Sequence, residues 1–397
     1  MAGGGLGRLW PERLRLGPLR PATFRSPLHD ERTAAVLGVA LGIAFSLCFA
    51  TGVVSHLIQH PPSWFEWPAR PAGLYRVTQG VHVAAGIAAI PLLFVKLWVV
   101  YPKLFTWPPA VDVAHALERA GLLVLVGGGV FMLFTGVANI ALWYPWGFFF
   151  PAGHYWGAWI TMGAIVAHVG AKTAITRRAL RRTARTAEPV TPDGGAALTR
   201  RGLLTTAFAA AGVLTLSTAG QTLGPLRRLS VLAPRRSDTG PQGLPVNKSA
   251  VAAGVTASAG GPGFRLVVTG AVARPLSLSR ADLEAMEGRE VTLPIACVEG
   301  WSAEARWRGV PVRDLLHAAG AVAGAEVDVE SLQPGGRYRR SVLSTGHAAD
   351  PDTLLALFVN GEPLALDHGY PVRLIGPNRP GVLQTKWVSI LRVRDPE

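Results

Sequence analysis

The segment Pro294-Ile-Ala-Cys-Val-Glu-Gly-Trp-Ser302 contains Cys297, the one cysteine outside the apolar first half of the chain. A single thiol cannot close a disulfide within its own domain, and one thiolate is too few to hold zinc or an iron–sulfur cluster. It can be a catalytic nucleophile, an inert buried cysteine, or the single protein ligand of a metal whose other ligands come from a cofactor. The residues around Cys297 favour the metal ligand.

Further motifs occur in a fixed order on both sides of this segment. They are Phe264–Gly270, an alternating strand pattern; Leu276–Leu283, a turn into a short helix; Trp307–Leu316; Val359–Leu364; Asp367–Leu374; and Gly381–Trp387. The ordered set resembles the sulfite oxidase family, and CVEGWS resembles the catalytic subunit of periplasmic methionine sulfoxide reductases. The resemblance covers residues 247–393. It implies an α+β molybdopterin-binding oxidoreductase domain, and hence an enzyme.

The resemblance also implies roles for single residues. Cys297 matches the thiolate ligand of molybdenum, a soft donor that suits a metal cycling between oxidation states. His368, Arg373 and Lys386 match positions that contact the pterin cofactor, whose phosphate needs fixed cationic donors. Asn247 resembles an asparagine that some members place against the pterin. Two glycines, Gly369 and Gly381, would let the backbone approach the cofactor closely.

The residues after Cys297 indicate the kind of substrate. Sulfite oxidases follow the metal-binding cysteine with an arginine-rich run that holds a dianion, whereas this chain has Val298-Glu-Gly-Trp301. Arg306 and Arg308 are the nearest cations that follow, and they could still reach an anionic substrate. The pattern favours reduction of a neutral oxide, such as a sulfoxide, over oxidation of sulfite.

The first half of the chain has the composition of a membrane protein. Hydrophobic residues make up 49% of the chain and charged residues 16%. Stretches of about 20 apolar residues can cross a bilayer as helices. We expect five such spans, which together with the domain above make a multi-domain protein: Thr33–Leu57, Val77–Val100, Ala120–Leu142, Trp156–Ile175 and the more weakly hydrophobic Leu203–Leu223.

The net charge of +14 comes from arginines that flank these stretches. No basic patch is interleaved with aromatic residues and no nucleic-acid motif occurs, so a nucleic-acid partner is not expected. Positive residues gather on the cytoplasmic side of membrane proteins. The rule predicts a multi-pass protein of the cell membrane with a cytoplasmic N-terminus and an extracytoplasmic C-terminal domain. The cations that decide this are Arg8, Arg13, Arg15, Arg20, Arg25 and Arg32, then Lys172, Arg177, Arg178, Arg181, Arg182 and Arg185.

The domain organisation follows from these features. Residues 1–185 are expected to form a four-helix membrane domain and residues 245–397 the molybdopterin domain. Residues 186–244 would hold a cytoplasmic linker, the fifth span at about 203–223, and a tether; the tether composition continues from Leu226 to Gly260. Thr199-Arg-Arg-Gly-Leu-Leu204 resembles a twin-arginine export signal, which moves folded domains. The alternative is an ordinary positively charged flank of a span.

Histidines in the apolar half have a spacing that suits haem. His154 and His168 are 14 residues apart, so on one helix they share nearly one face and lie roughly 21 Å apart. Intramembrane ionisable residues are usually functional. Two b haems, one near each side of the bilayer, would each need a second histidine. His82 has the right depth to pair with His154, and His29 to pair with His168.

The placement of these histidines on spans one, two and four is similar to the dihaem cytochrome b subunits of formate dehydrogenases and nickel–iron hydrogenases. Ser26-Pro27 looks like a helix N-cap and first position, which would put His29 on the first turn. His56 competes for the outer site. The alternative is that the histidines line helix contacts without binding metal.

Two functions remain open from the sequence. In the first, quinol is oxidised at the cytochrome part, and electrons pass through the haems to molybdenum and a small extracytoplasmic substrate, or in the reverse direction. A donor tethered within one chain has a high effective concentration. In the second, the helices form a haem-free anchor, sensor or transporter that carries an extracytoplasmic binding module.

Overall fold

The computed structural model describes residues 26–104, 111–181, 198–220, 224–233, 235–236, 238–286 and 288–395. The chain divides into two compact units. The helical unit comprises Met1–Ala50 and His82–Leu216, and the C-terminal unit comprises Thr51–Val81 and Ser217–Glu397. The segment Thr51–Val81, which joins the first two expected spans, therefore belongs with the C-terminal residues. The domain boundaries expected at residues 185 and 244 remain predictions.

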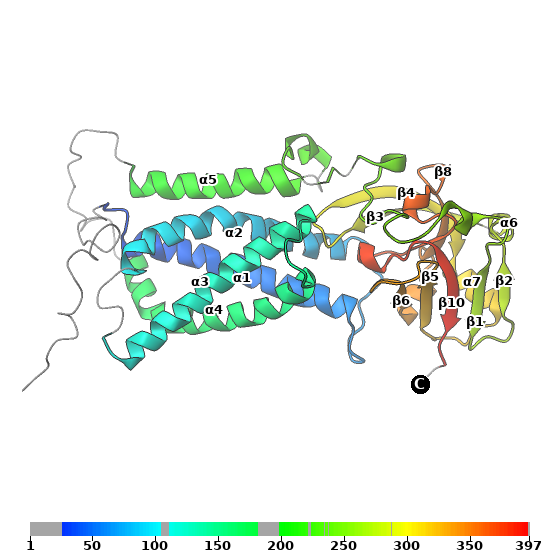
Figure 1. Cartoon of the computed structure of the whole chain (residues 1–397), viewed down its shortest axis with the longest axis horizontal. Coiled ribbons are helices and arrows are strands. Elements are labelled where there is room, and N and C mark those ends of the chain that lie inside the picture. Colours follow the sequence, from blue (N-terminus) through cyan, green and yellow to red (C-terminus); the bar gives the residue numbers. More distant parts are fainter. Residues whose placement is uncertain are drawn as a thin grey trace, which may run out of the picture. The chain divides into compact units, whose positions relative to one another are not determined.

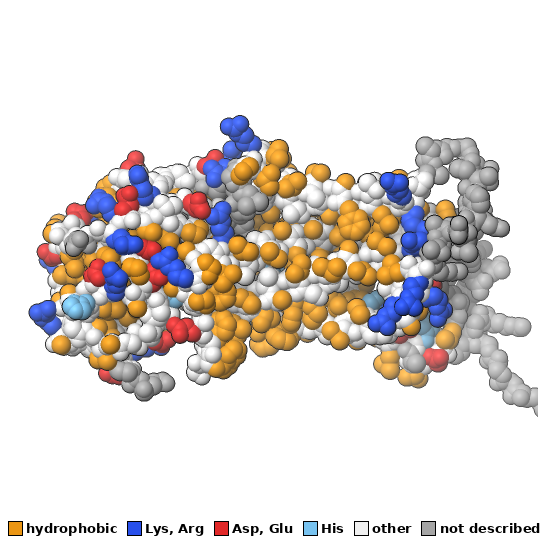
Figure 2. All heavy atoms as spheres, turned by 180° about the vertical axis from the view of Figure 1, so that it is seen from behind, with side chains coloured by type: hydrophobic (Ala, Val, Ile, Leu, Met, Phe, Trp, Pro, Cys, Tyr) orange, Lys and Arg blue, Asp and Glu red, His pale blue; other side chains and the backbone are white. Residues whose placement is uncertain are grey.

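Five helices in the described part of the chain are long and apolar enough to cross a membrane by length and composition. Each expected apolar stretch falls within or overlaps one of them. Apolar side chains cover much of the helical face drawn in Figure 2, as expected for residues that meet lipid. The helices, labelled in Figure 1, are α1 (Glu31–Gln59), α2 (Leu74–Leu104), α3 (Val113–Ala141), α4 (Phe150–Arg181) and α5 (Arg200–Ala219). The first 25 residues, the linker at 186–197, Arg182, Arg185 and positions 221–223 lie outside the described residues.

Small residues allow the helices of the helical unit to approach closely. Ala207 and Ala211 of α5 pack with Leu37, Leu41 and neighbouring residues of α1 and α2. Between α3 and α4, a Cβ added at Gly128 would lie 2.5 Å from Thr161 Oγ1, so only glycine fits there. Close backbone approach at small residues is typical of helices packed in membranes.

The start of α1 differs from the expectation. The helix begins at Glu31, and Asp30 Oδ1 accepts hydrogen bonds from the backbone N–H groups of Arg32 and Thr33 at 2.7 and 3.0 Å. Asp30 therefore satisfies the free donors of the first turn. The expected cap at Ser26 is wrong, and His29 lies in the turn before the helix.

The C-terminal unit contains two mixed or antiparallel sheets. The first has the order β2–β1–β10–β5–β6, in which β1 and β10 are parallel. The second has the order β3–β4–β7–β8, with β9 also paired to β7. The strands are β1 (Leu266–Gly270), β2 (Leu276–Leu278), β3 (Arg289–Ala296), β4 (Ser302–Pro311), β5 (Val327–Ser331), β6 (Arg340–Leu343), β7 (Leu354–Val359), β8 (Glu362–Pro363), β9 (Arg373–Ile375) and β10 (Val388–Val393).

Three short helices and two 3-10 turns lie between these strands, and three further 3-10 turns precede β1. The helices are α6 (Arg280–Ala285), α7 (Val312–Ala319) and α8 (Thr345–Ala349), and the turns are η6 (Gly224–Leu229), η7 (Pro241–Gly243), η8 (Ala257–Gly260), η9 (Leu366–His368) and η10 (Gly381–Leu383). The expected strand at Phe264–Gly270 is confirmed as β1. Where a turn and a helix were expected at Leu276–Leu283, the structure has β2 followed by α6. Ser279 and Asp282 form a capping box at the N-terminus of α6.

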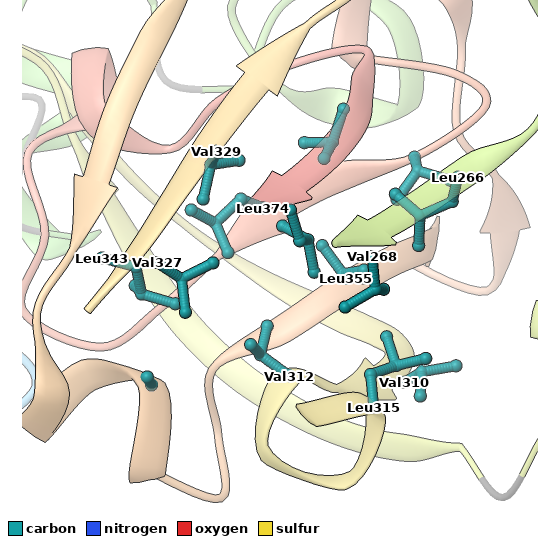
Figure 3. Packing of buried hydrophobic residues seen from close by; sticks show 14 of the residues in the cluster. Leu266, Val268, Val310, Val312, Leu315, Val327, Val329, Leu343, Leu355 and Leu374 are labelled. Atoms are coloured by element: carbon teal, nitrogen blue, oxygen red, sulfur yellow. The ribbon is translucent and has the colours of Figure 1, made fainter. Parts of the chain in front are cut away.

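The two faces of β7 pack into two different clusters. Leu355 and Leu357 join the cluster that Figure 3 shows, which draws on strands of both sheets. Leu354 and Ala356 face the other way, into a second cluster that contains Cys297. A strand buried on both faces needs a continuous apolar run, and Leu-Leu-Ala-Leu-Phe-Val supplies it. The fully buried strand thereby supports the wall of the site.

Candidate active site

Cys297 lies in the loop of a tight hairpin. β3 and β4 pair antiparallel up to Ala296 and Ser302, and the Cys297 N–H donates to the Trp301 carbonyl at 2.9 Å. The Gly300 N–H donates to the Cys297 carbonyl at 3.1 Å, and Gly300 has a φ of 83°, which glycine adopts without strain. The Cys297 residue is 1% exposed. The hairpin thus fixes a buried thiol in one position.

The five residues that the sequence assigned to the cofactor line one cavity. They are Asn247, Cys297, His368, Arg373 and Lys386. They come from the segment before β1, the β3–β4 loop, η9, the start of β9 and the residues before β10. Asn247 Nδ2 lies 3.9 Å from Cys297 Sγ. The rest of the lining is largely apolar, with Leu244, Pro245, Ile295, Trp301 and Gly381.

Two cations of the cavity, the partly buried Lys386 and the buried Arg373, form no ion pair with any described residue. Lys386 Nζ donates only to the carbonyls of Lys248 and Asp367, at 2.9 and 2.7 Å. Burial, with repulsion from Arg373, lowers the pKa of Lys386 to about 7. Arg373 donates to the His368 carbonyl at 3.1 Å, its Nε has no described partner, and burial lowers its pKa to about 10. A buried cation is costly unless it is paired, so this cavity suits an anionic ligand.

His368 differs from the other two because it is neutral. Its Nε2 lies 2.8 Å from the Pro241 carbonyl, which can only accept, so Nε2 holds the proton. Burial lowers the pKa of His368 to about 4, although this hydrogen bond opposes the shift. At neutral pH the imidazole is therefore an uncharged wall of the cavity. In the protein alone His368 therefore adds no positive charge to the cavity, and its contact with the pterin stays a prediction.

Two glycines keep the cavity floor open. Gly369 has a φ of 111°, and a Cβ there would lie 3.1 Å from Arg373 Cβ and 3.2 Å from Lys386 Cα. A Cβ at Gly381 would lie 3.2 Å from the Ala296 carbonyl. Side chains at these positions would push apart the residues that line the cavity. The thiol, the two unbalanced cations and this glycine cradle together fit a molybdenum–pterin cofactor with its phosphate.

Arg306 and Arg308 do not reach the cavity. Residues of β4 alternate, so that Ala303, Ala305 and Trp307 are buried while the arginines are exposed on the other face. Arg306 pairs with Glu290 at 3.5 Å, and the Arg308 guanidinium lies over the Phe358 ring at 3.7 Å. The expectation that they could reach an anionic substrate is wrong, because strand geometry directs them away from it.

Part of the expected tether instead belongs to the site. Arg235 Nε lies 3.2 Å from Glu299 Oε2, and the Trp301 indole N–H donates to the same carboxylate oxygen at 3.1 Å. Burial raises the pKa of Glu299, and these two neighbours oppose the rise. Gln242 donates to the Pro363 carbonyl at 2.6 Å. The proline, glycine and serine content of residues 226–260 gave no signal of this packing.

The helical unit brings two of the expected haem ligands together. The ring centres of His82 and His154 are 6.2 Å apart. His82 Nδ1 lies 3.0 Å from the Cys48 carbonyl, and His154 Nδ1 lies 2.8 Å from Thr135 Oγ1. Both rings are therefore oriented through hydrogen bonds at Nδ1. A Cβ at Gly136 would lie 3.6 Å from His154 Cε1, so the side of this ring is uncrowded.

The other histidines have different surroundings. His29 Nδ1 lies 3.1 Å from the Val99 carbonyl, and its ring centre is 4.5 Å from that of Trp98. His168 is on α4. His56, the competitor for the outer haem, stacks on His60 with ring centres 4.7 Å apart. Of the two expected haem-ligand pairs, His82 with His154 is the one for which a ring contact is described.

Comparison with known proteins defines the class of the C-terminal domain. Residues 254–397 match the family model described as the oxidoreductase molybdopterin binding domain. Mitochondrial sulfite oxidase of Mus musculus is 32% identical over 161 residues, which cover 34% of this chain and 30% of that protein. NAD(P)H nitrate reductase of Hordeum vulgare is 45% identical over 93 residues, or 21% of this chain and 10% of that one. This part of the chain is therefore a molybdopterin-binding oxidoreductase domain with sulfite oxidase and nitrate reductase homologues, which are enzymes.

The match is confined to this domain. The chain spans less than a third of the length of these relatives. Among solved structures, the sulfane dehydrogenase SoxCD of Paracoccus pantotrophus aligns with 34% of this chain and 38% of that chain, at 28% identity and a TM-score of 0.31.

Proposed function

We propose that the chain is a membrane-bound molybdenum oxidoreductase that exchanges electrons between the quinone pool, through two b haems, and a small extracytoplasmic substrate. The observation that carries the proposal is the cavity in which the Cys297 thiol lies with Lys386 and Arg373, two cations that form no ion pair with a described residue. A thiolate ligand and an anion site in one enclosed space are what a molybdenum–pterin cofactor requires.

The residues have distinct roles in this proposal. Cys297 would ligate molybdenum, Lys386 and Arg373 would bind the pterin phosphate, and Asn247 and His368 would contact the pterin. In the protein alone, burial raises the pKa of Cys297 to about 12, and Glu299 adds to the rise. The thiolate therefore needs the metal charge to form, and ligation releases its proton. When bound, the cofactor supplies two-electron redox chemistry.

The charges that line the cavity support a neutral substrate. Lys386 and Arg373 are committed to the phosphate in this assignment, and His368 is uncharged. Arg306 and Arg308 lie on the opposite face of β4. No further cation lines the cavity as described, so a dianion such as sulfite gains little there. We propose a sulfoxide-like oxide, reduced to the corresponding sulfide.

Contacts of His82 and His154 support an outer b haem. A metal bound by both imidazoles at about 2 Å would lie roughly 3 Å from each ring centre, and the observed separation of the ring centres is 6.2 Å. We propose a second, inner haem bound by His29 and His168. Quinol would donate electrons to these haems within the lipid bilayer. The five apolar helices support this location, with an extracytoplasmic C-terminal domain exported through the twin-arginine segment.

One preparation tests the proposal as a whole. The full chain, purified in detergent, should contain molybdenum and two protohaems per chain, and should reduce methionine sulfoxide with a reduced viologen dye as donor. Sulfite with ferricyanide as acceptor is the matched comparison and should give little turnover. A preparation that binds neither metal group would favour the haem-free anchor with a binding module.

A further inference from the structure

A hydrogen-bonded chain joins the C-terminal end of α1 to the loop before β6. Ser55 and Gln59 are one turn apart on α1 and face the same side. Gln59 Nε2 lies 3.1 Å from the Ser55 carbonyl and 3.1 Å from Ser55 Oγ, while Gln59 Oε1 lies 3.2 Å from the Tyr338 hydroxyl. Ser55 Oγ lies 3.2 Å from the Tyr75 hydroxyl. All four residues belong to the C-terminal unit.

The direction of these bonds is fixed by the Ser55 carbonyl. A carbonyl can only accept, so the Gln59 amide must turn its NH2 group toward Ser55. Gln59 Oε1 then faces Tyr338 and can only accept. The Tyr338 hydroxyl therefore donates its proton to Gln59, and its oxygen keeps lone pairs for a donor on the other side.

One tyrosine of this chain packs against the Cys297 hairpin, and the chain connects the other tyrosine to it. Tyr75 is 1% exposed and packs in a cluster with Ile58 and Ala296, the residue before Cys297. Burial raises the pKa of Tyr338; Arg337 opposes the rise, and the charge of Cys297 adds to it. The hydrogen-bonded chain through Gln59 and Ser55 thus connects the Tyr338 hydroxyl to Tyr75, which packs against the residue before Cys297.

The segment Thr51–Val81 is anchored firmly enough to hold this chain in place. Asn378 is 2% exposed, and both its backbone and its side chain bond to the segment. Its Oδ1 accepts from the Tyr75 N–H, its Nδ2 donates to the Pro68 carbonyl, its N–H donates to the Ala72 carbonyl and its carbonyl accepts from the Trp67 indole, at 2.6, 2.6, 3.0 and 3.0 Å. Arg70 also forms a two-pronged pair with Asp350 at 2.9 and 3.0 Å.

We propose that Gln59 is a positioning residue of the molybdenum site, which fixes the Tyr338 hydroxyl so that its oxygen accepts a hydrogen bond beside Cys297. The inference rests on the proposed function, because it takes Cys297 to mark the reacting centre. Reduction of a sulfoxide by quinol breaks the S–O bond and yields sulfide, quinone and water, with both electrons and both protons supplied by the quinol. The water that forms is a donor of the required kind. An expected membrane helix thereby contributes to the extracytoplasmic site.

Gln59→Leu in the full chain tests this role, because it removes the acceptor for Tyr338. With reduced viologen and methionine sulfoxide we expect kcat to fall about tenfold, as for a misplaced reacting group, with KM changed less than twofold and molybdenum content unchanged. Hydrogen exchange at the amides of residues 336–340 should rise, which reports on the Tyr338 loop independently of turnover. Arg76→Gln is the matched control in the same segment, because it removes an exposed pair with Glu304 at 2.7 Å. It should behave as the unaltered chain does.

A double-mutant cycle separates positioning from general loosening. Gln59→Leu added to Tyr338→Phe should cost nothing further in kcat if Gln59 acts only through Tyr338. Additive losses, an unaltered kcat in Gln59→Leu, or an equal loss in Arg76→Gln would each overturn the inference. If Gln59→Leu does not accumulate, Gln59→Glu keeps an acceptor for Tyr338 and should retain most of kcat. If the unaltered chain holds molybdenum but reduces no sulfoxide, the substrate assignment has failed. Hydrogen exchange and the molybdenum(V) resonance spectrum then still test Gln59.

Discussion

At the scale of single residues, the cavity beside Cys297 contains two cations that form no ion pair with a described residue. Arg373 is buried and Lys386 is partly buried, and both donate hydrogen bonds to backbone carbonyls. Without an anion these cations destabilise the folded state, since each has lost its hydration. A cofactor with a phosphate would restore the balance, so cofactor binding and stability of the domain should be coupled.

The first residue-scale prediction concerns Cys297. Cys297→Ser should lower turnover to background, because a hydroxyl is a poor substitute for a soft thiolate at molybdenum. The chain should still insert and fold, since the two side chains have nearly the same shape. Cys48→Ala is the matched control, because Cys48 is not among the residues that line the cavity. Dye-linked activity per folded chain measures both, and full activity in Cys297→Ser would remove the assignment.

The second residue-scale prediction concerns His347 and the pH dependence of the stability of the C-terminal unit. His347 is 3% exposed, and burial lowers its pKa to about 4; repulsion from Arg379 adds to this shift and a hydrogen bond to the Pro377 backbone opposes it. The unfolded chain therefore takes up the proton first, and stability is lost as pH falls from about 6.5 to 4, by at most about 3 kcal/mol. His347→Gln should reduce the fall in the thermal midpoint of the C-terminal unit between pH 7 and 5. Exposed His317→Gln should leave that fall unchanged; an unchanged fall in His347→Gln would contradict the assignment.

At the scale of elements, the sequence predicted the helices and strands whose formation depends on residues close together in the chain. Runs of apolar residues indicate the five stretches, and an alternating pattern indicates the strand at β1. Side chains alternate between the two faces of β4, so the sequence predicts that Arg306 and its neighbours in the strand point to opposite faces. Alternation alone does not show which of these faces lies toward the cavity. The packing of Thr51–Val81 with residues more than 250 positions later depends on tertiary contacts, such as those of Asn378, and has no local signal. The neutral state of His368 likewise depends on burial and on Pro241.

The element-scale prediction concerns the start of α5. Arg200→Lys with Arg201→Lys should leave the C-terminal domain in the cytoplasm, because the change keeps both charges and removes only the guanidinium groups that twin-arginine recognition needs. An ordinary charged flank would tolerate it. Protease accessibility in spheroplasts measures the outcome, and Arg177→Lys with Arg178→Lys on α4 is the control. A domain that remains outside in the altered chain would show that Arg200 and Arg201 are an ordinary flank.

At the scale of the whole molecule, the sequence predicted which residues of the cofactor site meet, although they come from separate parts of the chain. Recognition of ordered motifs made this possible, because the spacing between them is irregular. The segment that holds Tyr338 was missed for the opposite reason: Ser55, Gln59 and Tyr75 match no motif of the family. The expected depth of His82 and His154 in the spans predicted that they lie close together, and their rings are in contact; their pairing at a haem stays a prediction.

The haem prediction belongs to this scale because it concerns both sides of the bilayer. His82→Ala and His154→Ala should each remove the same outer haem, and His29→Ala and His168→Ala the inner one, since each haem loses an axial ligand. Either loss should stop quinol oxidation while the molybdenum domain still accepts electrons from a dye. Redox difference spectra and haem content of the four variants measure this. Loss of a haem in His56→Ala, with both retained in His29→Ala, would show that the pairing is wrong.

The central claim is that Cys297 binds molybdenum, and X-ray absorption at the molybdenum edge of the purified full chain tests it most directly. The account predicts three sulfur neighbours in the unaltered chain, one from Cys297 and two from the pterin, and one sulfur fewer in Cys297→Ser at equal molybdenum content. An identical sulfur count in the two proteins would contradict the account.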